Sequence, residues 1–437
     1  MSPEIMTLFL FGSLLLCLAI GIPISFALGG VALLFTFYLW GQNAIHMAVM
    51  NIAGLQMGFM LVCVPLFIFM GVILEKSGIA DDLFNMMYQW IGPFSGGLAI
   101  GTVLICTLFA AMSGISAVGT VVMGVIALPA MLKRNYNKTI ALGSIMAGGA
   151  LGILIPPSIM FILYGFMANV SIGQLFIGGI IPGLILSSLF IIYIAIRCRL
   201  QPHLGPPVPP EQRLGTMKKL TMLGSLVLPV LLVIGVLGSI FMGIASPTEA
   251  AAIGAFGSII CAVVKRRLNW ALLREASMRT LSVTCMALWI TIGAQLFTSV
   301  YAALGGQQLM INLLASLEVN RWTILIAIQI SLFFLGMIMD PIGIILLTTP
   351  IYVPAIKYLG FSPVWFGVIF VINMEMAYLT PPFGFNLFYM KGIAPPEVSM
   401  ADIYRSIIPF VILQAIGLAF VIVFPQLAMW LPSLMIK

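Results

Sequence analysis

Long apolar stretches without alternation constrain the fold of this chain more than any other feature. Examples are Leu8 to Ile20 and Met222 to Ile234, in which polar and apolar residues do not alternate. The strands of a membrane barrel alternate over about ten residues, whereas a helix needs roughly 20 apolar residues to span a bilayer. Since backbone groups in lipid must bond within the protein, these stretches predict transmembrane helices.

The balance of residue types excludes a water-soluble fold. Hydrophobic residues make up 62% of the 437 residues and charged residues 7%, against about a quarter charged in an ordinary soluble domain. A soluble protein of this size cannot bury so much apolar surface. The sequence begins Met-Ser-Pro-Glu, with no basic region or cleavage site, which indicates a first span rather than a signal peptide. We therefore expect an all-α polytopic membrane protein.

Ten spans and two ambiguous stretches follow from the hydropathy pattern. The spans are about 5–22, 24–40, 58–75, 139–166, 175–196, 221–242, 246–264, 280–302, 363–391 and 406–430. His46, between the second and third spans, is expected in an interfacial stretch. The stretches at about 97–131 and 322–356 have polar residues in the middle. Each is either one ordinary span or a re-entrant hairpin that returns to the side from which it entered.

The distribution of basic residues favours two hairpins. With both stretches as hairpins and the N-terminus outside, 16 of the 19 Lys and Arg residues fall on one side, and Arg321, Lys357 and Lys437 fall on the other. The positive-inside rule places the larger group in the cytoplasm. Reading either stretch as a full span erases this asymmetry. The net charge of +7 is therefore a topology signal and not a sign of nucleic-acid binding.

The two halves of the sequence repeat at one offset. Pro156, Pro157 and Tyr164 correspond to Pro381, Pro382 and Tyr389, since 381 − 156, 382 − 157 and 389 − 164 all equal 225. The first hairpin opens to the cytoplasm and the second to the outside, so the repeats are inverted, as in many secondary transporters. The expected parts are N-terminal spans for scaffold or partner contact (1–57), a first repeat with the hairpin at about 97–131 (58–199), a Pro-rich cytoplasmic loop (200–220), connecting scaffold spans (221–275) and a second repeat with the hairpin at about 322–356 (276–437).

Paired prolines break one long span in each repeat. A proline inside a helix removes an N–H group and frees the carbonyl four residues earlier, so Pro157 frees that of Ile153 and Pro382 that of Tyr378. A plain kink relieved by a neighbouring hydroxyl is one reading. The other is a cation site, because unwound carbonyls at membrane depth are tolerated where they line a cavity or bind an ion.

Na⁺ fits the residues near these breaks better than a proton relay does. Hydroxyls come from Ser113, Ser116 and Thr380, and Asp340 lies in the middle of the second stretch. The alternative is local: Thr380 bonds back within its helix and Asp340 caps the next one. Glu249 follows Ser246-Pro247-Thr248, which favours a role at a helix start. Glu375 is either a proton site or the partner of a basic group.

Catalytic and metal-site patterns do not occur. The six cysteines stand singly, without metal-ligand spacing. The sequence contains no phosphate-binding loop, no zinc-protease motif, no Gly-x-Ser-x-Gly and no haem pattern. We expect no enzyme activity, no organic cofactor and no metal other than Na⁺. An ion channel that uses the same broken helices remains an alternative to a transporter.

Five motifs in a fixed order cover nearly the whole chain. They are Ser113-Gly114 with Ser116, Gly152 to Ser158 continuing to Tyr164-Gly165, Pro247 to Ala252, Gly336 to Pro341, and Asn373 to Phe388. In this order they resemble the large membrane subunit of tripartite ATP-independent periplasmic (TRAP) transporters. Two features depart from the family pattern, because Ile115 and Gly119 replace a Ser and an Asp expected at the first tip. Glu375 and Ala377 are also unusual.

The resemblance implies an elevator-type transporter of the ion-transporter superfamily in a bacterial or archaeal inner membrane, with Na⁺ held between each hairpin tip and its broken helix. The first Na⁺ site is placed at Ser113, Gly114, Ser116, Gly152, Ile155 and Pro157. The second is placed at Gly336, Asp340, Ala377, Thr380 and Pro382, and the substrate is placed at Ser158 and Asn386. The implied partners are a small four-helix membrane subunit and an extracytoplasmic binding protein that delivers an organic anion. A single-component anion:sodium symporter of related fold is the nearest alternative.

Overall fold

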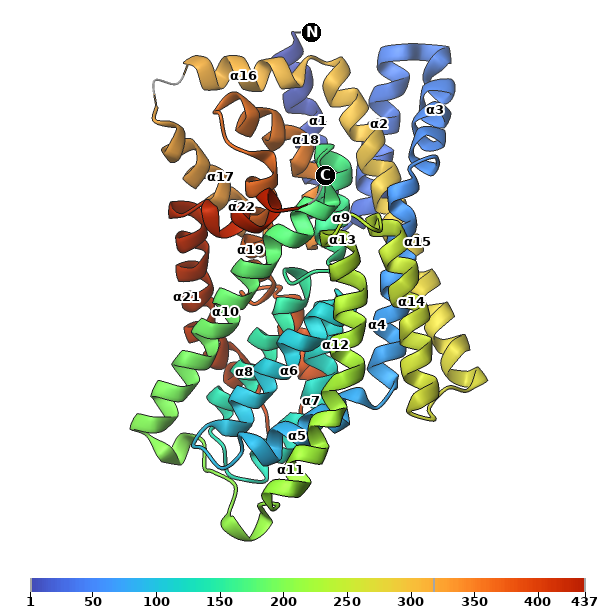
Figure 1. Cartoon of the computed structure of the whole chain (residues 1–437). Helices are drawn as coiled ribbons and strands as arrows, with labels where there is room; N and C mark the ends of the chain where they lie inside the picture. The colour runs from blue at the N-terminus through green and yellow to red at the C-terminus, as the bar shows by residue number, and fades with distance from the viewer. Residues whose placement is uncertain (1, 317–318, 436–437) are drawn as a thin grey trace.

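The computed structural model describes residues 2–316 and 319–435, and within them all regular structure is helical (Figure 1). Eight helical segments in these residues are long and apolar enough to cross a membrane. The chain is thus an all-α polytopic membrane protein, as predicted. Lys437, one of the three basic residues expected outside, lies beyond the described residues.

Two sets of five helices form the repeats. The first set is α6 (Gly97–Ser113), α7 (Ser116–Leu132), α8 (Lys138–Ala150), α9 (Ile159–Ala168) and α10 (Ile172–Leu200). The second is α17 (Arg321–Gly336), α18 (Pro341–Tyr358), α19 (Pro363–Tyr378), α20 (Phe385–Ile393) and α21 (Met400–Val423). The pairs α6–α7 and α17–α18 confirm both hairpins. Figure 1 places α6 and α7 in the lower half of the molecule and α17 and α18 in the upper half, so the hairpins enter from opposite ends.

Both predicted helix breaks are present. Between α8 and α9 the chain forms a short 3₁₀ turn, η3 (Leu151–Ile153), and then a non-helical segment with a cis Pro156-Pro157 bond. Between α19 and α20 it unwinds around a cis Pro381-Pro382 bond. The half-helix beyond each break packs on the hairpin of the other repeat, since α9 contacts α18 and α20 contacts α7. The two repeats therefore form one interlocked core.

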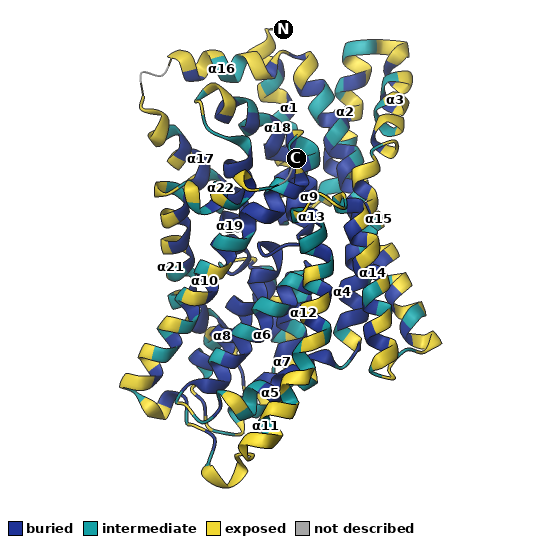
Figure 2. Cartoon of the chain, in the orientation of Figure 1, coloured by how far each residue is buried: buried dark blue, intermediate teal, exposed yellow. Residues whose placement is uncertain are grey.

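The remaining helices surround this core. They are α1 (Pro3–Ala19), α2 (Ile24–Trp40), α3 (Ala44–Gln56), α4 (Cys63–Lys76), α5 (Ile79–Trp90), α11 (Thr216–Met222), α12 (Val227–Val233), α13 (Ser239–Phe241), α14 (Pro247–Val264), α15 (Trp270–Ala303), α16 (Gly306–Ser316) and α22 (Gln426–Ser433). Exposed residues gather on outer helices such as α3, α14 and α21, and buried residues fill the centre (Figure 2). Because many of the exposed side chains are large and apolar, lipid is the solvent that suits this surface.

Three parts of the chain differ from the expected span pattern. Residues 44–56, which include His46 of the expected interfacial stretch, form the helix α3, which packs on α2 and α15. Helix α15 has 34 residues and begins at Trp270, ten residues before the expected span. The amphipathic helix α5 was not predicted, because Asp81 and Asp82 lower its hydropathy, although one of its faces is buried. A search for long apolar runs misses helices that are short or half polar.

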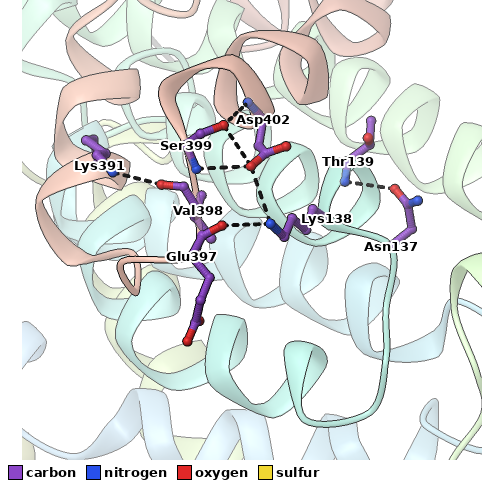
Figure 3. A network of polar contacts seen from close by, with 8 residues as sticks. All are labelled: Asn137, Lys138, Thr139, Lys391, Glu397, Val398, Ser399 and Asp402. Carbon is purple, nitrogen blue, oxygen red and sulfur yellow. Dashed lines mark hydrogen bonds and ion pairs between the residues drawn. The ribbon is translucent and has the colours of Figure 1, made fainter.

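A network of polar contacts joins the two repeats (Figure 3). Lys138, the first residue of α8, donates to the Glu397 carbonyl at 2.7 Å and lies 3.4 Å from Asp402 Oδ2. Asp402 and Ser399 form a capping box at the start of α21. Glu249 forms the same arrangement with Ser246 at the start of α14, so its predicted helix-start role is confirmed. Lys138 thus links the entry of the first broken helix to the final span of the second repeat.

The inverted hairpins predict opposite accessibility for two matched positions. Lys133 follows α7, Lys357 lies at the end of α18, and both side chains are exposed. In a variant without the six native cysteines, we expect Lys357→Cys to react with an impermeant maleimide in intact cells. Lys133→Cys should react only after the membrane is permeabilised, because its hairpin opens to the cytoplasm. Equal labelling of both positions in intact cells would contradict the inverted topology.

Candidate functional site

The first hairpin tip fits against the first helix break through two glycines. Gly114 has a left-handed backbone with φ of 65°. A Cβ at Gly114 would lie 2.1 Å from the Pro157 carbonyl oxygen, and one at Gly152 would lie 3.0 Å from the backbone of Ile115. Side chains at these positions would push the two segments apart. Glycine therefore allows the tip and the break to meet backbone to backbone.

Two helix C-terminal ends converge at this contact. Helix α6 ends at Ser113, and the η3 turn that follows α8 ends at Ile153. The last carbonyls of a helix lack N–H partners and carry partial negative charge. Ser113 Oγ is also buried and has no hydrogen-bond partner among the described residues. All six residues predicted for the first cation site lie in this tip or in the segment 152–157, where such oxygens suit a cation.

The second tip repeats this arrangement with different atoms. A Cβ at Gly336, where α17 ends, would lie 2.3 Å from the Cβ of Ala377 near the end of α19. Beyond the tip, the Phe383 N–H donates to the Met337 carbonyl at 3.3 Å. The hairpin and the break are thus held together, and two helix C-terminal ends again meet. Of the predicted second site, Gly336 and Ala377 are in contact here, Asp340 follows the tip, and Thr380 and the exposed Pro382 lie in the break.

Asp340 and Thr380 make the local bonds of the alternative interpretation. Asp340 Oδ2 accepts the Ile342 N–H at 3.0 Å and caps α18. Thr380 Oγ1 donates to the Met376 carbonyl at 2.8 Å, one turn back in α19. These bonds leave the other Asp340 oxygen and the lone pairs of the Thr380 hydroxyl available as cation ligands. Both residues therefore stay candidates.

The two residues predicted to bind substrate lie inside the core in this structure. Ser158 is buried, and its hydroxyl donates to the carbonyl of Ile153, which Pro157 leaves without a helical hydrogen bond. Asn386 is also buried: its Oδ1 accepts Ser116 Oγ at 2.9 Å and its Nδ2 donates to the Met146 carbonyl at 3.1 Å. Asn386 thereby joins the second break to the first tip. Neither residue lines the cavity described next, so their predicted role in substrate binding stays a prediction.

A cavity of about 230 Å³ lies between the two hairpin tips. The first turns of three helices line it: Ser116 to Val118 of α7, Ile159 and Met160 of α9, and Ile342 of α18. Among the described lining residues, Arg279 of α15 is the one cation and Asp340 the one carboxylate. Helix N-terminal ends carry partial positive charge. The cavity therefore combines an environment suited to an anion with an acidic group at one tip.

Sequence reasoning missed several polar residues of this region. Arg279 was counted with the cytoplasmic basic residues, because the expected span began one residue later. Tyr378 and Tyr389 also line the cavity; the repeat marks Tyr389 as the counterpart of Tyr164 without giving it a role, and no sequence signal marks Tyr378. Glu375 is fully buried and accepts Gln414 Nε2 at 3.0 Å. Within the described residues Glu375 pairs with Gln414 and with no basic group, and its predicted roles as a proton site or as the partner of a basic group stay predictions.

Comparisons with known proteins agree with this architecture. Residues 11–427 match the family model for the tripartite ATP-independent periplasmic transporter, DctM component. The chain is 31% identical to the C4-dicarboxylate TRAP transporter large permease protein DctM of Vibrio cholerae, with 95% of each protein covered. It is also 31% identical to the isethionate TRAP transporter permease protein DctMQ of Oleidesulfovibrio alaskensis, covering 96% of this chain and 65% of that protein.

A solved structure supports the fold independently of sequence. The YdaH transporter of Alcanivorax borkumensis superposes with a TM-score of 0.65 over 90% of each chain, at 15% sequence identity. At that identity the likeness concerns the fold alone. The family match over nearly the full length and the relatives that are 31% identical carry the assignment. The chain belongs to the DctM family, the large membrane component of tripartite ATP-independent periplasmic transporters.

Proposed function

We propose that this chain is the large permease subunit of a Na⁺-coupled transporter that imports an organic anion by an elevator-like movement. The observation that carries the proposal is the cavity between two hairpin tips, each tip seated on a broken helix. Inverted repeats with broken helices at mid-membrane are typical of secondary transporters. Relatives named for C4-dicarboxylate and isethionate transport support an organic anion as the substrate.

Charge balance supplies a physical reason for the coupling. An anion that enters the cavity meets Asp340 as well as Arg279, and Arg279 is already paired with Glu75. Like charges at close range in a medium of low dielectric repel strongly. A Na⁺ ion bound beside Asp340 cancels this repulsion and attracts the substrate anion. Na⁺ and substrate then favour each other's binding, as symport requires.

The packing of the core supports movement of the site as one body. Each broken helix contacts the hairpin of the other repeat, and Asn386 bridges the second break to the first tip. A displacement of one tip relative to the other breaks these contacts. An elevator movement instead keeps the two tips and the broken helices together while they shift against the surrounding helices, among them α4 and α15, which complete the cavity in this structure.

The proposed partners complete a three-part system in a bacterial or archaeal inner membrane, with the N-terminus outside. A small membrane subunit is supported by the relative named DctMQ, of which this chain covers 65%. The word tripartite in the family description supports a third component, which we propose is an extracytoplasmic binding protein that delivers the anion. Loss of uptake when either partner is omitted would support this composition.

Uptake into proteoliposomes tests the coupling ion. The chain, reconstituted with its membrane and binding-protein partners, should accumulate labelled succinate or isethionate when an inward Na⁺ gradient is imposed. An equal K⁺ gradient should give only the background of protein-free liposomes. The reason is that the candidate ligands are carbonyl and hydroxyl oxygens with one carboxylate, rather than a chain of buried acids and histidines. Full accumulation driven by a pH gradient without Na⁺ would contradict the proposal.

A further inference from the structure

Arg279 occupies an unusual place for a basic residue of a membrane protein. It lies on α15, in the first third of a 34-residue helix, and lines the cavity between the hairpin tips. Its Nη1 donates to Glu75 Oε2 of α4 at 2.7 Å. The Glu75 side chain is 9% exposed and that of Arg279 is 39% exposed. Within the ion pair, Glu75 is therefore nearly buried, whereas Arg279 remains partly exposed.

The guanidinium group retains unused donors in this geometry. It has five N–H donors in a planar fork, and Glu75 is its one acceptor among the described residues. A carboxylate accepts two parallel N–H bonds from such a fork, an arrangement with stronger and more directional bonds than a neutral pair. Glu75 holds the side chain in place and leaves its free edge available to the cavity.

The surroundings of Arg279 favour an anion of small size. The first turns of α7, α9 and α18 line the same cavity, and their N–H groups and dipoles attract negative charge. The cavity volume of about 230 Å³ is below the roughly 300–1,000 Å³ of pockets for drug-sized ligands. The remaining lining is mostly apolar, with Tyr378 and Tyr389 as further polar groups.

We infer that Arg279 is a substrate-binding residue that takes the carboxylate of a small organic acid, with Glu75 as the residue that positions it. This inference rests on the proposed transport function and adds to it a recognition group outside the hairpins and the broken helices. The tips then hold the Na⁺ ions while α15 contributes the cation for the substrate. A neutral molecule of the same shape is not recognised, because it cannot form the charged pair.

Thermal unfolding of the purified transporter complex tests the role of Arg279. The probes are succinate and pyruvate as carboxylates and succinamide as the neutral counterpart of succinate, each in NaCl or KCl. We expect at least one carboxylate to raise the unfolding temperature of the wild type in NaCl, and succinamide to have no effect. The double variant Arg279→Gln with Glu75→Gln removes both charges and leaves no unpaired buried ion.

The double variant should require about 10- to 100-fold more carboxylate for the same protection, as expected for the loss of a hydrogen bond to a charged group. The double variant Lys76→Gln with Glu275→Gln is the matched control and should retain protection, because it removes an ion pair between the same two helices, α4 and α15, and neither of its residues lines the cavity. Protection of the Arg279 double variant at wild-type concentrations, protection by succinamide, or no protection by either carboxylate would each overturn the assignment. Carboxylate protection that is equal in NaCl and KCl would instead contradict Na⁺ coupling and leave Arg279 as the binding residue.

Discussion

Gly114→Ala is expected to abolish Na⁺-driven uptake while the protein still inserts and folds. The added Cβ would lie 2.1 Å from the Pro157 carbonyl oxygen, and the residue has a φ of 65°. Since real Cβ atoms essentially never approach within 3.0 Å, the tip must retreat from the break by about an ångström. That displacement separates the oxygens of the first candidate cation site. Uptake by proteoliposomes at matched protein content measures the effect.

Gly305→Ala is the matched control for this change. Gly305 also has a left-handed backbone, with φ of 74°, but no atom of the described residues lies within 4 Å of the Cβ position. Both variants carry the conformational cost of alanine in this region, about 1–2 kcal/mol, and only Gly114→Ala adds the collision. We expect Gly305→Ala to transport at close to the wild-type rate. Normal uptake by Gly114→Ala would show that close contact between tip and break is not needed for transport.

The positions of the hairpins and breaks could be predicted because they rest on strong local rules. The polar centre of the stretch 97–131 and the count of basic residues indicate a hairpin, and α6 and α7 meet at Gly114. Paired prolines cannot continue a helix, so the breaks follow directly from Pro156-Pro157 and Pro381-Pro382. Because the two halves repeat at an offset of 225 residues, a hairpin or break predicted in one repeat is also predicted in the other. These signals need no knowledge of distant contacts.

The cavity could not be predicted, because it depends on contacts between segments far apart in the sequence. Arg279 reaches it only because α15 begins ten residues earlier than hydropathy indicates. Asn386 bonds to Ser116 across 270 residues, and this contact draws it into the core instead of the cavity. The tyrosines that match in the repeat also differ: Tyr164 is buried and donates to the Pro363 carbonyl at 2.7 Å, whereas Tyr389 lines the cavity. A sequence repeat predicts equivalent positions but not equivalent surroundings.

Asp340→Asn is expected to raise the Na⁺ concentration for half-maximal uptake by about tenfold or more. Asparagine caps a helix as well as aspartate does, so the bond to the Ile342 N–H is kept and α18 still begins at Pro341. What is lost is the negative charge at the second tip. Removal of a charged partner costs about 1.5–3 kcal/mol, which corresponds to a factor of roughly ten to a hundred in affinity. Uptake measured against Na⁺ concentration gives this value directly.

Thr380→Val tests the same site through a neutral ligand and allows a closer control. Valine keeps the shape of the side chain and removes the hydroxyl that donates to the Met376 carbonyl. Thr348 makes the equivalent bond to the Ile344 carbonyl at 2.7 Å within α18, so Thr348→Val removes the same type of hydrogen bond without changing the tip or the break. If Thr380 is a cation ligand, its variant shifts the Na⁺ dependence and Thr348→Val does not. If both hydroxyls only satisfy their own helices, the two variants lose similar stability and neither changes the Na⁺ dependence. An unchanged Na⁺ dependence in both Asp340→Asn and Thr380→Val would remove the second tip from the coupling mechanism.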